Sequence, residues 1–353
     1  MNEEQNGRIL VGMSGGLDST YTALRYKAQG YDVEGAVLRM SAETDVHAAA
    51  LAAEQVGIPL HVLDAQDAFE TYVKSYFANE YAHGRTPNPC VMCNRYVKIA
   101  VLCDYAETHG IPRISTGHYA HIGFDSETGR YYTQAAADRK KDQSYFLWQL
   151  TQKQLSMLET PLADCNKAQI REEALEKGLR AAQAKESQDI CFLPNGDYIF
   201  FVEQRLGVFP TGDFIDERGM CVGQHQGIIR YTVGQRKGLG IALGHPVFVS
   251  RIDAERNTVH LAPAGMEYRD TVTVRGIVCQ KLRPEMLCAG LRVAVKIRYA
   301  AKPALAVVTH ADTEEGVAQI QFDTAQRAVT PGQSAVFYDS GTMQDILFGG
   351  WIV

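Results

Sequence analysis

The chain has 353 residues, of which 46% are apolar and 22% charged, and its formal net charge is −6. This composition is typical of globular proteins, and the length predicts two or three domains. No apolar run approaches the roughly 18 residues of a membrane span, and the N-terminal segment is acidic where a signal peptide is basic, so we expect a cytoplasmic protein without a membrane partner.

The first third of the chain alternates between strand and helix patterns. Short apolar strands are predicted at 8–13, 33–38, 60–65 and 113–122. Helices are predicted between them, each followed by a glycine, at 19–29, 44–56 and 94–109. Strict alternation predicts the α/β class, with a doubly wound parallel sheet, helices on both faces and ligands at the carboxyl ends of the strands.

The pattern changes in the rest of the chain. Residues 140–200 are predicted to be helical and charged, and residues 207–250 are glycine-rich with short strands. From residue 258 onward, several short segments alternate between apolar and polar residues. Such segments, separated by turns, predict a small β-barrel or sandwich.

Basic residues concentrate in one part of this otherwise acidic chain. Residues 225–302 contain 13 lysines and arginines against 5 acidic residues. Such a segment suits a docking face for nucleic acid, and the alternative is a set of basic strands that face water.

The first predicted strand runs into a glycine-rich loop, GMSGGLDST, at residues 12–20. Gly15 and Gly16 permit backbone angles that direct successive N–H groups toward an anion, and the next helix adds positive potential from its N-terminus. No Gly-Lys-Ser/Thr follows, so this is not a Walker A loop. With no lysine in the loop, we expect phosphate charge to be neutralised by amides and Mg²⁺, with Asp18 touching the metal. A tight turn without a ligand is the alternative.

Two cysteines lie three positions apart in TPNPCVMCNR, residues 86–95. In a reducing compartment, Cys90 and Cys93 could belong to a zinc site, a redox disulfide or an iron–sulfur site, or one could be a nucleophile. Structural zinc is disfavoured, because the chain has no second Cys-x-x-Cys and no paired histidines.

Eight blocks together indicate one family: GMSGGLDS, GRTPNPCVMCN, TGHYA, KDQSYFL, KESQDICF, GIIRYTVGQRKGLGI, KIRYAAKP and VTPGQSAVFYD. The first resembles the pyrophosphatase loop of N-type ATP-pyrophosphatases. All eight, in this order, resemble the bacterial tRNA-specific 2-thiouridylases nearly end to end. The resemblance implies three domains: an adenine nucleotide hydrolase-like ATP-pyrophosphatase domain at 1–203, a small central tRNA-contacting domain at 204–268 and a tRNA-binding β-barrel at 269–353.

The family replaces the C2 oxygen of the wobble uridine of tRNA with sulfur, so the resemblance implies a tRNA-uridine 2-sulfurtransferase. The loop would bind MgATP, and adenylation of the uridine oxygen would release pyrophosphate and later AMP. By resemblance, Cys191 receives sulfur as a persulfide from a cysteine-desulfurase relay. Cys93 then acts as the nucleophile, and the two cysteines end as a disulfide. A mobile segment at 185–197 would let the thiols meet.

The sequence departs from the family at Cys90, where many members have an aspartate that touches the target base. A thiol could move a proton there, but it is a different acid–base group. Alternatively, Cys90, Cys93 and Cys191 hold a four-iron four-sulfur cluster that delivers the sulfur. Two other hypotheses are an ATP-pyrophosphatase that adenylates a small molecule, and an RNA-binding module that merely holds a nucleotide.

The resemblance also assigns the remaining site residues. The nucleotide would contact Gly12, Met13, Ser14, Gly15, Gly16, Leu17, Asp18, Ser19, Leu38 and Gly117. The tRNA would contact Asn88, Pro89, Cys90, His118, Lys141, Asp142, Gln143, Arg298, Tyr299 and Gln333. Without the resemblance, most of these would be core, turn or strand-surface residues. Charge reversal at Arg236, Lys237 or Arg298 is expected to weaken tRNA binding. The other cysteines are expected to be small buried hydrophobic residues: Cys103, Cys165, Cys221, Cys279 and Cys288.

Overall fold

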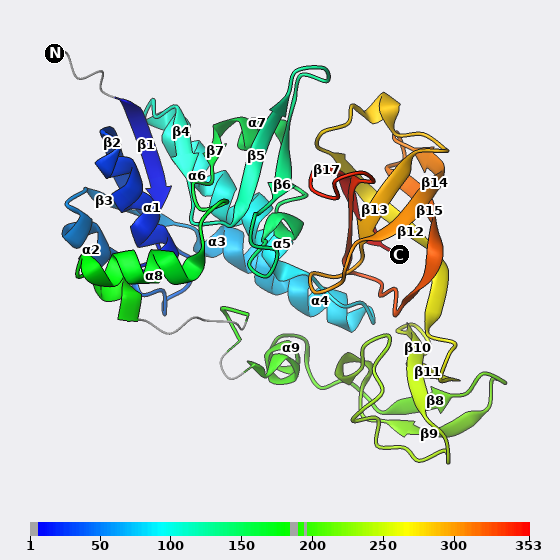
Figure 1. The fold of residues 1–353 in the computed structure, drawn as a ribbon. Coiled ribbons are helices and arrows are strands. Elements are labelled where there is room, and N and C mark those ends of the chain that lie inside the picture. Colours follow the sequence, from blue (N-terminus) through cyan, green and yellow to red (C-terminus); the bar gives the residue numbers. More distant parts are fainter. Residues whose placement is uncertain (1–5, 184–189, 194–195) are drawn as a thin grey trace.

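The protein is described by a computed structural model that covers residues 6–183, 190–193 and 196–353. Figure 1 shows a helix-covered sheet formed by the N-terminal part of the chain, a smaller central sheet, and a C-terminal barrel. The α/β fold and the barrel predicted from the sequence are both confirmed.

The first lobe is built on a five-stranded sheet. Its strands are β1 (Asn6–Gly12), β2 (Tyr31–Arg39), β3 (Leu60–Asp64), β4 (Arg113–Ser115) and β7 (Leu158–Glu159). They lie in the order β3-β2-β1-β4-β7, and every neighbouring pair is parallel. The order reverses direction between β1 and β4, so the carboxyl ends of these two strands border the crevice where such sheets bind ligands.

Helices cover both faces of this sheet. The helical segments of the first lobe are α1 (Leu17–Ala28), α2 (Val46–Val56), α3 (Gln66–Phe69), η1 (Glu70–Ser75), α4 (Tyr76–Ala82), α5 (Pro89–Cys93), η2 (Asn94–Lys98), α6 (Ile99–Thr108), η3 (Ser144–Phe146), α7 (Gln152–Met157), α8 (Lys167–Glu176), η4 (Arg180–Gln183) and α9 (Tyr198–Leu206). Ile9 and Val11 of β1 pack with residues of α1 and α2, whereas Leu10 packs with residues of α6. This alternation is what a strand buried on both faces requires. None of the helices in the described ranges is both long enough and apolar enough to cross a membrane.

Two segments of the first lobe differ from the sequence prediction. The helical run from α3 to α4 was not predicted, although Phe69, Val73 and Phe77 are buried at the four-residue spacing of a helix. The single strand predicted at 113–122 is two strands, β4 and β5 (Ala120–Asp125), and β5 pairs antiparallel with β6 (Arg130–Ala135). The chain leaves the sheet between them at Gly117, which packs directly against the backbone of the glycine loop.

The central sheet contains β8 (Gly212–Ile215), β9 (Cys221–His225), β10 (Val247–Asp253) and β11 (Thr258–Pro263), with a short turn of helix, η6 (Ile228–Arg230). The strands lie in the order β10-β11-β8-β9. Their core includes Phe214, Val249 and Leu261, and it continues into Phe77 of α4 and Val202 of α9. The central sheet therefore shares one apolar cluster with helices of the first lobe.

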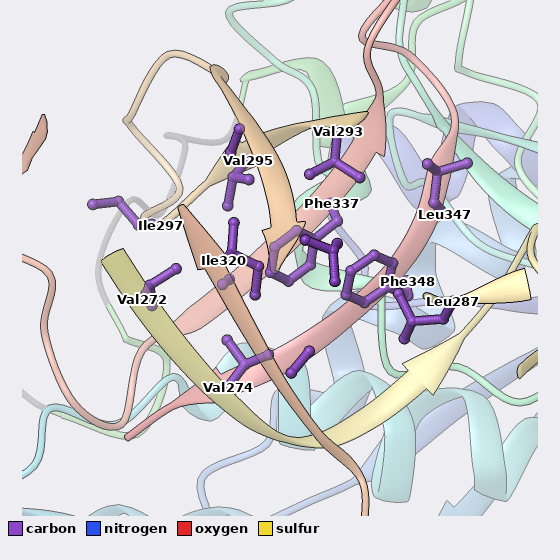
Figure 2. Close-up of a cluster of buried hydrophobic side chains, with 14 of the residues drawn as sticks. Val272, Val274, Leu287, Val293, Val295, Ile297, Ile320, Phe337, Leu347 and Phe348 are labelled. Atoms are coloured by element: carbon purple, nitrogen blue, oxygen red, sulfur yellow. The ribbon is translucent and has the colours of Figure 1, made fainter. Parts of the chain in front are cut away.

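The C-terminal part is a closed six-stranded barrel in the order β12-β15-β14-β13-β16-β17. Its elements are β12 (Tyr268–Cys279), η7 (Pro284–Met286), β13 (Arg292–Lys296), β14 (Ala304–Asp312), β15 (Val317–Arg327), β16 (Ser334–Asp339) and β17 (Ile346–Ile352). Figure 2 shows inward-pointing side chains from several strands filling its interior, including Val274, Ile320, Phe337 and Phe348. The rings of Phe337 and Phe348 stack with centroids 4.1 Å apart. The interior is therefore a packed core rather than a channel.

The barrel is joined to the first lobe by buried polar contacts. The Gln280 side chain, which is 0% exposed, accepts a hydrogen bond from the Thr133 amide at 2.8 Å. Its amide nitrogen donates to the carbonyls of Leu147 at 2.8 Å and Trp148 at 3.0 Å. The Trp148 indole donates to the Ser334 hydroxyl at 2.9 Å. These contacts satisfy backbone groups of the first lobe that would otherwise be buried without partners.

We expect Gln280→Ala to lower the free energy of unfolding by about 1–3 kcal/mol, because it removes the partner of the Thr133 amide and of the Trp148 carbonyl. Chemical denaturation followed by tryptophan fluorescence would measure this change, since Trp148 lies at the joint. The control is Gln319→Ala on the exposed face of β15, which should change stability by less than about 0.5 kcal/mol. Equal stability of the two variants would contradict the role given to Gln280.

Candidate active site

A cavity of about 270 Å³ opens at the carboxyl ends of β1, β2 and β4. Nine of the residues assigned from the sequence line it: Gly12, Met13, Ser14, Asp18, Ser19, Leu38, Gly117, His118 and Gln143. Its lining also contains residues that the sequence analysis missed: Val37, Met40, Thr44, Asp45, Lys98, Leu102 and Thr116. The cavity lies at the predicted edge of the sheet, and we call it the loop cavity.

The glycine loop connects β1 to α1 at one side of this cavity. Gly15 has a φ of 77°, and a Cβ there would lie 2.7 Å from the backbone of Ala48 in α2. Gly16 forms the N-cap of α1 without a side-chain cap, so the first amides of α1 remain available to an anion. Leu17 instead packs in the core. The loop thus has the backbone geometry of an anion site, and a glycine lies where α2 packs closely against it.

The Asp18 carboxylate has two partners from distant parts of the chain. The Tyr119 hydroxyl donates to it at 2.8 Å, and Lys167 of α8 forms an ion pair with it at 3.0 Å. The loop itself contains no lysine, but the fold brings Lys167 from the distant helix α8 beside it. A carboxylate among hydroxyl groups fits a hard cation such as Mg²⁺ together with phosphate oxygens.

The Cys90–Cys93 pair lies on α5 beside the loop cavity. Cys93 is 5% exposed and packs among apolar residues that include Phe69 and Val97. Burial raises the pKa of the Cys93 thiol to about 12, and nearby Lys98 only partly opposes this rise. Cys90 is exposed, but its surroundings partly desolvate the thiol and raise its pKa as well. Both thiols are therefore protonated at neutral pH in this state.

Lys98 brings the three candidate cysteines into one electrostatic cluster. Burial lowers the pKa of its ammonium, but Cys93, Cys90 and Cys191 all lie near enough to raise it once they are ionised, and the net change is a rise. The fold thus unites Cys191 with a pair that lies far away in sequence. Among the described residues, no three His, Cys, Asp or Glu side chains are grouped closely enough to share a metal ion.

Cys191 is exposed, and the next residue in the chain, Phe192, packs among aromatic rings. The Phe192 ring contacts the rings of Phe69, Phe77 and Phe201 at centroid distances of 5.7, 5.3 and 5.1 Å. Phe192 thus inserts between helices of the first lobe. The expectation of a mobile segment at 185–197 involves residues 185–189 and 194–195, which lie outside the described residues.

His118 is a neutral imidazole at the cysteine side of the loop cavity. Burial lowers its pKa to about 3, with a further contribution from the charge of Lys98. Its Nδ1 lies 2.8 Å from the Thr116 hydroxyl. A neutral histidine is suited to hydrogen bonding with a base or a phosphate, but it carries no charge for either.

The barrel holds the start of the cysteine helix. Gln333 donates hydrogen bonds to the carbonyls of Thr86 and Pro87, each at 3.1 Å, and the Thr86 amide donates to Pro331 at 2.9 Å. Asn88 and Pro89, which follow, are buried. The Gln333 side chain therefore positions this segment in addition to any contact with RNA.

A second cavity, of about 590 Å³, lies between the loop at 139–142 and the barrel. We call it the basic cavity. Its lining includes four basic residues and an aromatic residue: Arg139, Lys140, Lys296, Lys302 and Tyr299. Tyr299 is 39% exposed, and its ring lies 4.6 Å from that of Phe146. Positive charge beside an accessible ring is typical of single-stranded nucleic-acid sites.

Two residues assigned to tRNA are already engaged within the protein. The Asp142 carboxylate is buried and accepts from the amides of Ala136 and Ser144, at 3.1 and 3.0 Å. Arg298 donates to the carbonyls of Val233 and Ala328, both at 3.2 Å. Lys141 is half-buried. Charge reversal at Arg298 would break the contact between the central lobe and the barrel, so it is not a clean test of RNA binding.

Comparison with known proteins covers almost the entire chain. Three family models match in succession: a tRNA methyl transferase HUP domain at 7–195, a tRNA methyl transferase PRC-barrel domain at 200–263 and an aminomethyltransferase β-barrel domain at 277–353. The tRNA-specific 2-thiouridylase MnmA of Acetivibrio thermocellus is 44% identical over 98% of this chain and 99% of its own. That of Clostridium acetobutylicum is 38% identical over 99% of both chains.

The chain belongs to the tRNA-specific 2-thiouridylase family. The resemblance seen in the sequence is thereby confirmed, and the HUP domain with its loop implies the use of ATP. Within this 2-thiouridylase fold, the prediction that the other cysteines are buried holds for Cys103 only. Cys165 and Cys279 are half-buried, and Cys221 and Cys288 are exposed, because alternate residues of a strand and residues of turns face water.

We expect Gly117→Ala to weaken nucleotide binding by this 2-thiouridylase about tenfold or more. The new Cβ would lie 2.9 Å from the backbone of Asp18, and such overpacking costs on the order of 1–3 kcal/mol. Calorimetric titration with a non-hydrolysable ATP analogue measures the effect. The control is Gly7→Ala, where no atom lies within 4 Å of the added Cβ. Unchanged affinity in Gly117→Ala would contradict placement of the phosphates at this loop.

Proposed function

We propose that this protein uses ATP to replace the C2 oxygen of the wobble uridine of tRNA with sulfur, in the cytoplasm. The observation that carries the proposal is the position of Lys98, which lines the loop cavity and also lies within electrostatic range of the three candidate cysteines. Adenylation and sulfur transfer act on the same uridine carbon, so they need a nucleotide site beside the thiols. Names of relatives that are similar over the full length support the same reaction.

The first step activates the uridine. ATP binds at the glycine loop, the uridine C2 oxygen attacks the α-phosphorus, and pyrophosphate leaves while AMP stays on the oxygen. The amides at the start of α1 and the ammonium of Lys167 stabilise the charge on the phosphates. Asp18 would hold Mg²⁺, which neutralises phosphate charge when bound.

The second step uses both catalytic cysteines. A cysteine-desulfurase system leaves a sulfane sulfur on Cys191 as a persulfide. Its terminal sulfur attacks C2, and the C2–O bond breaks with AMP as the leaving group. The Cys93 thiolate then attacks Cys191 Sγ and breaks the S–S bond, so the transferred sulfur keeps the electron pair as the 2-thio group. A thiol reductant reduces the Cys93–Cys191 disulfide for the next cycle.

Cys93 must lose a proton before it can act, because its burial favours the thiol. Cys90 lies one helical turn earlier, on α5, and is accessible. We assign it contact with the target base, beside Asn88 and Pro89, and the transfer of a proton during exchange. This role replaces that of the aspartate found in many relatives.

We assign catalysis and RNA binding to different lobes of the protein. We assign catalysis to residues 1–203, and the grip on tRNA to residues 204–268 and 269–353. The wobble base leaves its stack to reach the loop cavity, while His118, Gln143 and Tyr299 contact the RNA around it. Backbone phosphates dominate the affinity of such complexes, which suits the basic segment at 225–302.

The reaction is tested on protein purified without oxygen, with MgATP, a sulfur donor and unmodified tRNA. We expect mass spectrometry of the nucleosides to show 2-thiouridine without iron in the protein, and Cys93→Ser and Cys191→Ser to abolish it. Cys288→Ser, which alters an exposed barrel cysteine, is the control and should keep full activity. Thiolation that requires roughly four irons per chain, together with Cys90, would establish the iron–sulfur cluster instead. Full turnover of Cys93→Ser on a small molecule would indicate another ATP-pyrophosphatase.

Binding of tRNA is tested at Lys237, which is exposed in the central lobe. We expect Lys237→Glu to weaken tRNA binding and to reduce the slope of log affinity against log salt by about 1, because one phosphate contact is lost. Filter binding at several salt concentrations measures the slope, and affinity for an ATP analogue should not change. Lys177→Glu at the C-cap of α8, which is also exposed, is the matched control. Identical salt slopes in the two variants would exclude Lys237 from the interface.

A further inference from the structure

Lys98 owes its position to an irregular turn of helix. α5 ends at Cys93, and the next five residues form the π-helical turn η2, which ends at Lys98. A π turn closes its hydrogen bonds from residue i to i+5, whereas an α-helix closes them from i to i+4. Residues 93 and 98 therefore lie above one another, although a regular helix would point them in different directions. Such turns occur frequently at functional sites.

The Lys98 side chain faces two sites at once. It lines the loop cavity together with Ser14, Asp18 and His118. It also lies within electrostatic range of His118 and of all three candidate cysteines. Among the described residues it forms no ion pair with a carboxylate, in contrast to Lys167, which is paired with Asp18. A half-buried ammonium without a carboxylate is suited to an anionic ligand.

The chemistry of the proposed reaction specifies which anion this is. The uridine oxygen must reach the α-phosphorus, and the carbon bearing that oxygen must then be reached by sulfur. The α-phosphate therefore lies between the glycine loop and the cysteines, while the β- and γ-phosphates lie farther along the loop, toward α1. Lys98 is the cation on the cysteine side of the cavity, and Lys167 is the cation beside Asp18.

We propose that Lys98 binds the α-phosphate of the nucleotide and holds it as AMP leaves the uridine carbon. This inference rests on the proposed thiolation for the order of the two reactions, but its binding claim does not require tRNA. Negative charge on the α-phosphate grows when the C2–O bond breaks, and a fixed ammonium in a half-buried site stabilises that charge. Lys98 is thus a catalytic residue that the sequence analysis did not identify.

Calorimetric titration of the full chain with AMP and with adenosine tests the assignment, because the two ligands differ only in the α-phosphate. We expect the wild-type protein to bind AMP more tightly than adenosine. Lys98→Met should lose affinity for AMP about tenfold or more, since a charged hydrogen bond is removed, and should keep its affinity for adenosine. Lys98→Arg should retain most of the preference for AMP.

The control is Lys153→Met, which removes an exposed lysine paired with Glu107 and should change neither affinity. A preference for AMP that survives in Lys98→Met would overturn the proposal. If Lys98→Met also loses affinity for adenosine, the same titrations are made with Lys98→Gln and Lys98→Arg. The proposal requires that the glutamine variant lose the preference for AMP over adenosine and that the arginine variant keep it.

This test separates the inference from the proposed function. Preference for AMP that depends on Lys98, in a protein that makes no 2-thiouridine, supports the phosphate assignment and contradicts the thiolation. Formation of 2-thiouridine together with a preference for AMP that does not depend on Lys98 contradicts the phosphate assignment and leaves the thiolation intact.

Discussion

The contact between the barrel and the segment before α5 is the constraint on which the candidate site depends. The Gln333 side chain donates hydrogen bonds to the carbonyls of Thr86 and Pro87, and the Thr86 amide donates to the Pro331 carbonyl. A Cβ on Gly332 would lie 2.9 Å from the Thr86 carbonyl oxygen. This close approach fixes where α5 begins and therefore where Cys90 and Cys93 lie. The barrel thus contributes to the geometry of the candidate site.

On that helix, two opposing effects act on the pKa of the Cys93 thiol: burial raises it, and the positive charge of Lys98 lowers it. Cys93 lies in an apolar cluster that favours its thiol, and Lys98 opposes this effect from the next turn. A cysteine kept protonated until its partner arrives is protected from oxidation, because the thiolate is the reactive form. Phe192, the residue after Cys191, contacts three aromatic rings of the first lobe.

Much of the fold could be predicted from the sequence, because its signals are local. The strands β1 to β3 and the helices α1, α2 and α6 follow apolar patterns with clear ends, and the glycine loop is a contiguous motif between β1 and α1. The prediction failed where the hydrophobic pattern of a segment does not match the course of the backbone. The segment 113–122 has the composition of one strand, but the chain leaves the sheet at Gly117, and only the neighbouring loop explains why. The prediction of burial fails for Cys221 of β9 and for Cys288, which lies in the connection between η7 and β13, because residue type alone does not tell whether a position faces the core or water.

The sequence by itself determined the family, the order of the lobes, the phosphate loop and the identity of the candidate cysteines, since each rests on contiguous residues. Only the tertiary structure decided which charged side chains lie beside the loop and the cysteines. Lys167 reaches Asp18 from a distant helix, and Lys98 reaches the cysteines because a π turn replaces an α turn. Neither position follows from a motif, because long-range packing and helix irregularity depend on contacts that are not adjacent in the chain.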